Sequence, residues 1–451
     1  MIRAFKYLLR PTVKQQRALE AMLKDHCELY NAALEERRTA WSKCRERVGY
    51  FDQCGQLKDV RRDDPEGQGR WAAGSQQATL RRLDHAYTAY FRRCSAGRKP
   101  GHPRFRSARR FDSVTWPQHG NGCGWDPNRD DPVTRVRLLG VGHVRVHRHR
   151  PLEGRIKTIT VKREGRRWYI VLACEIAVPE PWPKTGRAIG LDLGITRFAT
   201  TSAGEHVPNP KHLEASAAKI AEAQRALAAF PARVPYSERT KRHRLASERA
   251  AKLHRRVARQ RTDFAHKTAL DLVRRFDVIA VEALNVQGMT RRVEPRPDPD
   301  RPGDHLANGA AAKAALNRKI LDAGWRQFLN LLAYKAAWAG REVKAVNPAY
   351  TSQKCPRQDC GYTCGENRHR EVFHCTRCGY HDHADRVGAM NVASRAGLVR
   401  FDGAHVPPEE VEPMWRTRRD GVIIGADRGS GGYLTHPARC PAGGQSEGTK
   451  L

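Results

Sequence analysis

Three acidic residues stand where a carboxylate could do chemistry. Asp192 lies in GLDLG, between apolar residues of an expected buried strand, with glycines that leave room for a ligand. Glu282 follows the apolar run VIAV, and Asp385 opens an expected helix. Burying a carboxylate is costly unless a partner compensates its charge, and a hard divalent cation compensates best. Together the acids predict a Mg²⁺ site that could act on a phosphodiester, although each alone also fits a structural role as turn former, strand end or helix cap.

A group of cysteines predicts a second metal site. Five of the twelve cysteines crowd into one short stretch, at Cys355, Cys360, Cys364, Cys375 and Cys378. Cys375-x-x-Cys378 followed by glycine is typical of a zinc knuckle, and Cys355 with Cys360 can form the other knuckle. Four thiolates close the coordination shell, so the expected Zn²⁺ is structural. Because the first pair is separated by four residues and not the usual two, Cys364 or the weaker candidate His374 could replace a ligand.

Composition indicates the kind of partner. The chain has 451 residues, enough for two or three domains, and 82 Lys and Arg against 48 Asp and Glu give a formal net charge of +34. Nucleic acid is the natural partner, because phosphate contacts release counterions. A basic protein with no polyanion partner, or a membrane-surface binder, is the alternative. We find no membrane-spanning run and no signal peptide, which favours the cytoplasm or the nucleoid.

The first part of the chain reads as strands and amphipathic helices. AFKYLLRP is an expected strand, and Thr12 with Gln15 predicts a capping box at the start of a helix. Helical spacing continues from 12 to about 47 and again over about 74–95, with a polar, Gly-containing stretch between them. From about 133 to 178 apolar and basic residues alternate around a Glu164-Gly165 turn, which predicts a hairpin with a basic face. This β-module either grips a nucleic-acid backbone or is a plain module with solvated basic side chains.

The second part reads as an α/β domain. After the linker PEPWPKTGR, strands and helices alternate from 186 onward. The stretch RTKRHRLASERAAKLHRRVARQR carries basic residues on nearly every helical turn, which favours a phosphate-facing surface over a merely solvated one. Beyond about residue 397 the chain is rich in Gly, Pro and charge, and we expect disorder there.

Several of these motifs resemble the TnpB (OrfB) family, transposon-encoded nucleases guided by RNA and related to the type V CRISPR effectors. FKYLLRPTVKQQ with ELYNAAL is similar to the amino-terminal segment of the family, and KPGHPRFRS to its Gly-x-Pro-x-Phe-Lys stretch. GLDLGITRFAT resembles its first RuvC motif and IAVEALNVQGM its second, while NPAYTSQKC through FHCTRCGYHDHADRVGAMNV resembles its zinc ribbon and third motif. The resemblance covers nearly all of residues 1–396.

Carried over residue by residue, the resemblance implies that Asp192, Glu282 and Asp385 are the Mg²⁺-binding catalytic triad. In the third motif Val387 and Gly388 replace the Asn and Ala that the family usually has, whereas all three acids are kept. The implied zinc ligands are Cys355, Cys360, Cys375 and Cys378. Expected contacts to a nucleic-acid backbone come from Arg104, Arg106, Lys252, Arg255 and Arg259.

The resemblance also implies a multi-domain α+β and α/β architecture. Residues 1–10 and 111–182 would form a wedge-like β-barrel, and 11–110 a helical recognition lobe. Residues 186–349 and 381–396 would form an RNase H-like RuvC nuclease domain. A four-cysteine zinc ribbon would be inserted at 350–380, and 397–451 would be a disordered tail. The insertion explains why Asp385 follows the knuckle so closely, because the chain must re-enter the nuclease fold there.

The implied function is Mg²⁺-dependent hydrolysis of DNA at a site chosen by guide pairing. The protein would belong to a transposable element and would act as a monomer in a complex with guide RNA and target DNA. We expect it to be cytoplasmic and associated with the nucleoid. Two other classes remain open. One is a nuclease-inactive RNA-guided DNA-binding repressor, which would leave target DNA intact. The other is a protein-only DNA transposase, which would need no RNA and would join ends.

Overall fold

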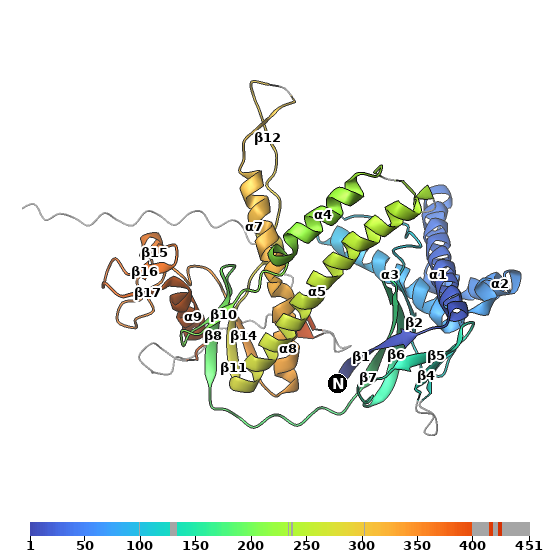
Figure 1. Cartoon of the computed structure of the whole chain (residues 1–451), viewed down its shortest axis with the longest axis horizontal. Coiled ribbons are helices and arrows are strands. Elements are labelled where there is room, and N and C mark those ends of the chain that lie inside the picture. The colour runs from blue at the N-terminus through green and yellow to red at the C-terminus, as the bar shows by residue number, and fades with distance from the viewer. Residues whose placement is uncertain are drawn as a thin grey trace, which may run out of the picture. The chain divides into compact units, whose positions relative to one another are not determined.

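The computed structural model describes residues 1–98, 100–126, 133–232, 234–235, 238–301 and 303–398, together with the backbone of the short strands β18 (Trp415–Thr417) and β19 (Ile423–Gly425). The chain divides into two compact units, Met1–Val178 and Pro179–Leu451, which Figure 1 draws. Most of the tail in which we expected disorder lies outside the described residues. None of the helices within the described ranges has the length and apolar character needed to cross a membrane.

The first unit is built on an antiparallel seven-stranded sheet. Its strands are β1 (Ile2–Arg10), β2 (Ser113–Trp116), β3 (Cys123–Asp126), β4 (Arg135–Leu138), β5 (Gly142–His147), β6 (Arg155–Glu164) and β7 (Arg167–Glu175). The order is β2-β6-β7-β1-β5-β4-β3, so β1 lies in the middle although it is first in sequence. Among the described residues β2 and β3 are free edges, which makes the sheet a half-barrel and leaves the expected closed barrel unconfirmed. The predicted β6-β7 hairpin is confirmed, with Glu164 opposite Arg167.

Helices cover this sheet. They are α1 (Val13–Thr39), which runs into a π-helical turn η1 (Ala40–Cys44), then α2 (Tyr50–Asp63), a 3-10 turn η2 (Gln68–Arg70) and α3 (Ala73–Ser95). The predicted capping box is present: the Gln15 amide donates to Thr12 Oγ1 at 3.3 Å, and the Thr12 amide donates to Gln15 Oε1 at 3.0 Å. Sequence reasoning missed α2, whose apolar stripe is short: Leu57 is buried, and Tyr50 and Cys54 are partly buried against the same core.

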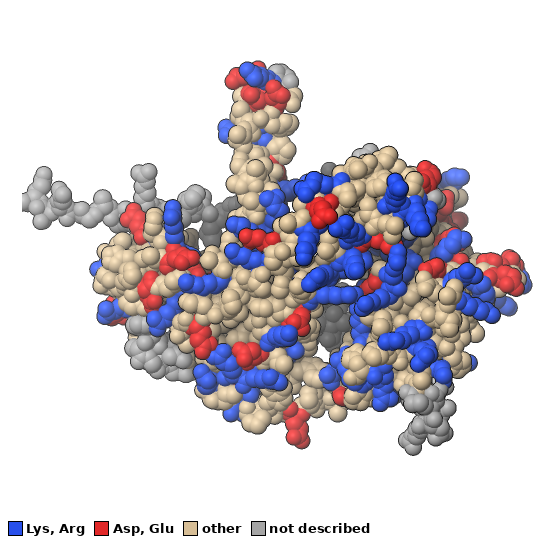
Figure 2. All heavy atoms as spheres, in the orientation of Figure 1, with Lys and Arg blue, Asp and Glu red and all other residues tan. Residues whose placement is uncertain are grey.

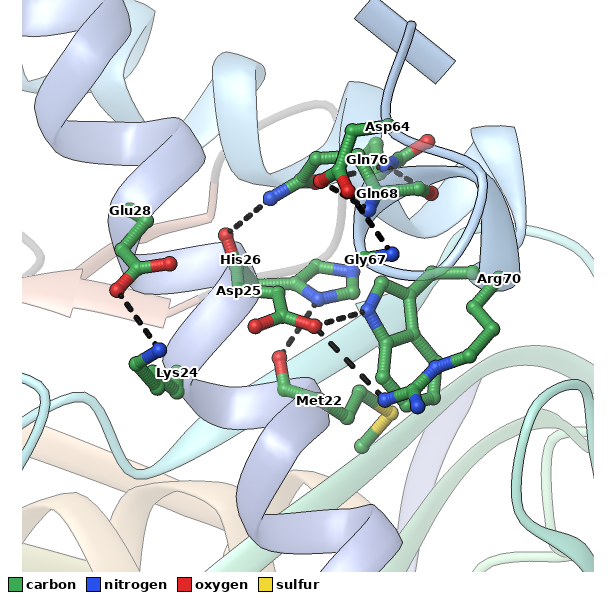
Figure 3. Close-up of polar contacts among 11 residues, drawn as sticks. Met22, Lys24, Asp25, His26, Glu28, Asp64, Gly67, Gln68, Arg70 and Gln76 are labelled. Carbon is green, nitrogen blue, oxygen red and sulfur yellow. Dashed lines mark hydrogen bonds and ion pairs between the residues drawn. The ribbon is translucent and has the colours of Figure 1, made fainter. Parts of the chain in front are cut away.

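A buried polar network joins α1 to the segment before α3 (Figure 3). The His26 ring is fully buried, with Nδ1 2.8 Å from the Met22 carbonyl oxygen and Nε2 2.9 Å from Ser75 Oγ. The Trp71 indole N–H donates to Asp25 Oδ2 at 2.8 Å. Because a carbonyl oxygen only accepts, Nδ1 of His26 carries a proton. Ser75 Oγ lies within hydrogen-bond distance of His26 Nε2 and also donates to the Ala72 carbonyl oxygen at 2.8 Å. The network joins α1 to α3 and to the segment before it.

The second unit contains a mixed five-stranded sheet. Its strands are β8 (Ala188–Asp192), β9 (Arg197–Thr201), β10 (His206–Pro208), β11 (Val278–Glu282) and β14 (Glu342–Val346). The order is β10-β9-β8-β11-β14, in which β8, β11 and β14 run parallel and β9 and β10 are antiparallel to their neighbours. The apolar runs of β8 and β11 are buried, as expected for parallel strands covered on both faces. The predicted α/β alternation is therefore present.

The helices of this unit are α4 (Ala217–Ala228), α5 (Lys241–Arg275), α6 (Val286–Met289), α7 (Ala310–Ala323), α8 (Trp325–Trp338) and α9 (Ala384–Arg395), with 3-10 turns η3 (Glu214–Ser216) and η5 (Gly365–Asn367). Leu272 on α5 and Phe328 on α8 share one apolar cluster with Ile279 of β11, so these helices cover one face of the sheet. A short hairpin of β12 (Arg296–Pro297) and β13 (His305–Leu306) projects next to α7 (Figure 1).

A small three-stranded sheet leads into the last helix. It consists of β15 (Arg368–His369), β16 (Val372–His374) and β17 (His381–His383), all antiparallel. Because β17 ends at His383 and α9 begins at Ala384, the chain passes from the cysteine-rich segment directly into α9.

Candidate metal centres

The parallel pairing of β8 and β11 places two of the predicted acids next to each other. Leu191 is opposite Val281, and the next residue on each strand is Asp192 and Glu282. Both therefore stand at the carboxyl edge of the sheet, where ligands of open α/β sheets bind. Glu282 is only 6% exposed, so its carboxylate is held largely away from water.

Helix α9 brings the third acid to the same edge. A β-carbon at Gly190 would lie 2.2 Å from the Ala389 carbonyl oxygen, so glycine there allows α9 to pack directly on β8. A β-carbon at Gly388 would lie 3.3 Å from Asp192 Cγ, so the residue that departs from the family motif faces the first acid. Asp385 lies in the first turn of α9 and is not its cap, because the N-cap residue is His383. The three acids that the sequence singled out are thus neighbours in space.

The electrostatics of the three acids favour a bound cation. Burial, and then the charges of Glu282 and Asp385, raise the pKa of Asp192 to about 8. Burial also raises the pKa of Glu282 above its usual range. Like charges this close resist simultaneous ionisation, so a cation between them would relieve the repulsion. Hard oxygen donors around such a position fit a divalent ion of the Mg²⁺ type.

Two polar residues that the sequence reasoning left without a role support this edge. Thr351 is only 4% exposed and donates its hydroxyl to Glu282 Oε1 at 2.7 Å. Asn391 of α9 donates to the carbonyl oxygens of Thr351 and Lys354, both at 2.7 Å. These bonds tie Glu282, the start of the cysteine-rich segment and α9 together. Thr351 and Asn391 both lie in the motifs that resemble the family, but no neighbouring residue in the sequence indicates their hydrogen-bond partners.

Arg368 supplies a positive charge to the acids. It lies on β15 of the small sheet, and its Nη2 is 3.3 Å from Asp385 Oδ1. Its charge also opposes the upward shifts of the pKa values of Asp192 and Glu282. Sequence reasoning missed Arg368, because it lies 17 positions before Asp385 and only the antiparallel turn through β16 and β17 brings the two side chains together.

The cysteine cluster has the geometry of a tetrahedral site. Its members are Cys355, Cys360, Cys375 and Cys378, whose sulfur atoms all lie within 4.8 Å of one another. The sulfurs of Cys355 and Cys378 are 3.7 Å apart, as are those of Cys360 and Cys375. Zinc–sulfur bonds of about 2.3 Å in a tetrahedron separate the sulfurs by about 3.8 Å, so the four thiols fit Zn²⁺.

The structure also decides which cysteines belong to the cluster. Cys360 is a member, whereas Cys364 and His374 are not among the four, so the wide spacing of the first knuckle is real. The backbone amide of Tyr380 lowers the pKa of the Cys378 thiol to about 7, whereas burial raises the pKa of Cys355 well above its usual range. A metal ion would be needed to hold all four as thiolates.

The basic residues expected to face phosphate lie in both units. On α5, Lys252, Arg255 and Arg259 share a face opposite the buried Ala250 and Val257; Lys252 and Arg259 are exposed and Arg255 is half-buried. Figure 2 shows Lys and Arg side chains gathered along this helix.

Arg104 and Arg106 are exposed on the segment after α3 in the first unit. The guanidinium of Arg106 lies 5.8 Å from the centre of the Tyr30 ring, and its backbone pairs with Asn31. The segment is therefore held against α1 while both side chains remain accessible.

The fold and the two centres define a class of protein: a half-barrel unit with helices, followed by a mixed sheet with acids at its carboxyl edge and a cysteine ribbon before the last helix. Family models match three parts of the chain: OrfB_IS605, described as "Probable transposase", at 171–293; Cas12f1-like_TNB, "Cas12f1-like, TNB domain", at 325–392; and HTH_OrfB_IS605, "Helix-turn-helix domain", at 1–46. In the structure residues 1–46 form β1 and the long helix α1 with its π turn.

Full-length relatives identify the family. "Putative RNA-guided DNA endonuclease InsQ" of Escherichia coli K12 is 30% identical over 408 residues, covering 90% of this chain and 95% of its own. A "Putative RNA-guided DNA endonuclease" of Streptomyces pristinaespiralis is 28% identical over 436 residues, which cover 95% of this chain and 98% of the relative. The chain therefore belongs to the TnpB (OrfB) family, as its motifs predicted. The solved structure of the "mini-RNA-guided endonuclease CRISPR-Cas_phi3" covers 91% of this chain and 94% of its own at 10% identity with a TM-score of 0.46, a likeness too distant to carry an argument.

Proposed function

We propose that this protein is an RNA-guided DNA endonuclease of a transposable element, with guide RNA and target DNA as its partners. Two full-length relatives carry that activity in their names, and the net charge of +34 suits a chain that binds two polyanions. The observation that carries the proposal is the convergence of Asp192, Glu282 and Asp385, which come from two strands and one helix far apart in sequence.

The three acids would hold Mg²⁺ at the carboxyl edge of the sheet, in an RNase H-like RuvC domain formed by 186–349 and 381–396. When bound, the divalent cation would polarise the scissile phosphodiester and lower the pKa of an attacking water. Asp192 and Glu282 are fixed by paired strands, so their oxygens are preorganised. Thr351 orients the Glu282 carboxylate through its hydroxyl. The Arg368 guanidinium, which lies 3.3 Å from Asp385, would add positive charge near the negative charge that develops on the phosphate.

The four cysteines would hold a structural Zn²⁺ in the ribbon at 350–380. Their closed set of donors leaves no open position for a substrate, so this ion would not take part in hydrolysis. Its role would be to fix the segment between β14 and α9, which contains Thr351 and Arg368. Residues 1–10 and 111–182 would act as the wedge domain, and the helices of 11–110 as the recognition lobe.

The decisive experiment is the Asp192→Ala variant in a cleavage assay programmed by a guide RNA with Mg²⁺ present. We expect cleavage to fall below detection while binding of the guide RNA is unchanged, because the change removes a metal ligand and leaves the basic surfaces intact. Asp271→Asn is the matched control, since Asp271 is an exposed acid on α5 that pairs with Arg275. Undiminished cutting by Asp192→Ala would refute the assignment. Intact target DNA with the unaltered protein would favour the repressor, and joined ends without RNA would favour the transposase.

A further inference from the structure

The helical part of the first unit exposes aromatic rings that its core does not use. Trp41 is 48% exposed, Phe105 is 50% exposed and Phe91 is 58% exposed. All three lie at or beyond the carboxyl-terminal ends of α1 and α3, although the unit buries other rings completely, such as Trp71 and Tyr30. Large exposed rings on a water-facing helical surface mark candidate interaction sites.

The backbone around Trp41 departs from regular helix. Residues Ala40–Cys44 form a π-helical turn, which ends at Arg45 in the left-handed conformation with φ of 57°. This reversal brings the guanidinium carbons of Arg45 and Arg47 to 5.7 and 5.9 Å from the centre of the Trp41 ring. Both features cost free energy, because π turns are rare and a left-handed arginine is disfavoured. Such local strain is typical of functional positions, and here it presents one indole with two cations.

The connecting segment after α3 adds a second exposed ring, that of Phe105. The guanidinium carbon of Arg38 lies 5.5 Å from the centre of the Phe105 ring. Arg38 and Trp41 are three positions apart on one helical run, so their side chains are neighbours on the same face of that run. The segment is anchored to α1, since the Arg106 amide donates to Asn31 Oδ1 at 2.7 Å and Asn31 Nδ2 donates to the Arg106 carbonyl at 2.8 Å. Phe105 is therefore held in place and not merely exposed.

The charge of this region is almost uniformly positive. Between residues 38 and 47 all side chains except that of Ala40 are exposed, and they include Arg38, Lys43, Arg45 and Arg47 against the single acid Glu46. A protein partner for such a surface would need an acidic face with apolar residues. A nucleic-acid strand supplies both requirements at once, because its backbone is anionic and its unpaired bases are flat and apolar on their faces. In a duplex those faces are already stacked on one another and are hidden from the rings.

We propose that Trp41, Phe105, Arg38, Arg45 and Arg47 form a stacking platform for unpaired bases of RNA. This arginine-aromatic platform deepens the proposed function, on which it rests for the choice of RNA over DNA. Successive bases insert next to the indole and the phenyl ring, and the guanidinium groups lie against the bases or pair with the flanking phosphates. The platform reads no sequence, because every base offers a flat face.

The test uses the full-length protein and a 12-nucleotide oligouridylate, without guide or metal. Trp41→Ala combined with Phe105→Ala should weaken binding at least about thirtyfold, since stacking on each of the two rings contributes about 1–3 kcal/mol per base. The slope of log K against log salt should stay constant, because no charge is removed. Arg45→Gln with Arg47→Gln should instead reduce that slope by about 1.4. Trp41→Phe with Phe105→Tyr keeps both rings and should restore most of the affinity.

A photochemical measurement locates the contact. Oligouridylate that carries 5-iodouridine should crosslink to peptides containing Trp41 or Phe105, as identified by mass spectrometry. Phe51→Ala is the matched control, because Phe51 on α2 is an even more exposed ring, at 83%, outside the platform. Its loss should leave affinity and crosslinks unchanged.

Three results would overturn the platform. They are crosslinks confined to other segments, an equal loss of affinity for an RNA duplex, and a loss for oligodeoxythymidylate that spares oligouridylate. The last result would assign the surface to a displaced DNA strand. Oligouridylate binding can be measured whether or not the protein cuts DNA, so this inference and the proposed nuclease activity fail separately.

Discussion

At the scale of single residues, the position of the Glu282 carboxylate depends on one hydroxyl group. Thr351 donates to Glu282 Oε1 at 2.7 Å in a buried setting. Thr351→Val keeps the volume and shape of the side chain but removes the donor. We expect the cleavage rate to fall about ten- to a hundredfold, because a hydrogen bond to a charged group contributes about 1.5–3 kcal/mol. The measurement is guided DNA cleavage as a function of Mg²⁺ concentration.

The control for Thr351 is Thr351→Ser, which retains the hydroxyl and should recover most of the activity. Both variants should melt within a few degrees of the unaltered protein. If Thr351→Val and Thr351→Ser lost activity equally, the methyl group would matter and the hydroxyl would not. A valine variant that cut at the normal rate at every Mg²⁺ concentration would remove Thr351 from the site.

A second residue controls stability and not catalysis. Burial lowers the pKa of His26 to about 4, from an ordinary value of about 6.5. The folded protein therefore favours the neutral ring, and this contribution is complete above pH 6.5 and decreases as the pH falls toward 4. A shift of that size corresponds to roughly 3 kcal/mol of folding free energy over the window.

The effect of His26 can be isolated by comparing pH dependences. His26→Gln has no titrating group, so its thermal unfolding temperature should fall less between pH 6.5 and 4.5 than that of the unaltered protein. Differential scanning calorimetry on both proteins measures this difference. Carboxylates titrate in both proteins and cancel in the comparison, so parallel curves would contradict the assignment.

At the scale of elements, the cysteine ribbon positions parts of the proposed nuclease site. It carries Arg368 on β15, and its chain runs without a linker from β17 into α9. Cys378→Ser removes one of the four sulfurs, so we expect the variant to lose its zinc and to cut DNA at least about tenfold more slowly. Elemental analysis should find about one zinc per chain in the unaltered protein and much less in the variant.

The ribbon prediction has a matched control. Cys94→Ser changes an exposed cysteine on α3 and should affect neither zinc content nor cleavage. A zinc-free preparation of the unaltered protein with full activity would contradict the structural role of the ion.

Elements defined by local pattern were predictable from the sequence. The Thr12 capping box, the β6-β7 hairpin and the buried runs of β8 and β11 each depend on a few neighbouring residues, and all are present. The acids at the strand ends could be predicted for the same reason, since an acid after an apolar run is visible in the sequence. Their convergence required the parallel pairing of β8 with β11, which the resemblance implied and local spacing does not determine.

Features that depend on distant contacts were not predictable. Helix α2 buries only one apolar side chain fully, that of Leu57, and its place is also set by distant contacts such as the bond from Arg37 to Gln53. The bond from Thr351 to Glu282 spans 69 residues, and Arg368 approaches Asp385 only after the small sheet has formed. Whether the first sheet closes also depends on its edges, β2 and β3, which pair with nothing further among the described residues.

At the scale of the whole molecule, the net charge of +34 makes association with nucleic acid strongly dependent on salt. A charge excess alone does not identify the binding surface, because a basic residue releases counterions only where it contacts a phosphate. Lys252, Arg255 and Arg259 share the face of α5 opposite the buried Ala250 and Val257. Outside α5, Arg62, Arg291 and Arg357 each pair with an acid, at Asp59, Glu294 and Asp359.

Two triple variants that each remove three positive charges can therefore distinguish binding through the α5 face from binding driven by the total charge. Changing Lys252, Arg255 and Arg259 to Gln should reduce the slope of log K against log salt for guide RNA by about 2–3, because each phosphate contact contributes about 0.7–0.9. Changing Arg62, Arg291 and Arg357 to Gln lowers the net charge equally but should leave the slope nearly unchanged. Fluorescence anisotropy with labelled RNA between about 50 and 200 mM salt measures both. Equal slopes in the two variants would mean that total charge drives binding and that the α5 face has no special part in it.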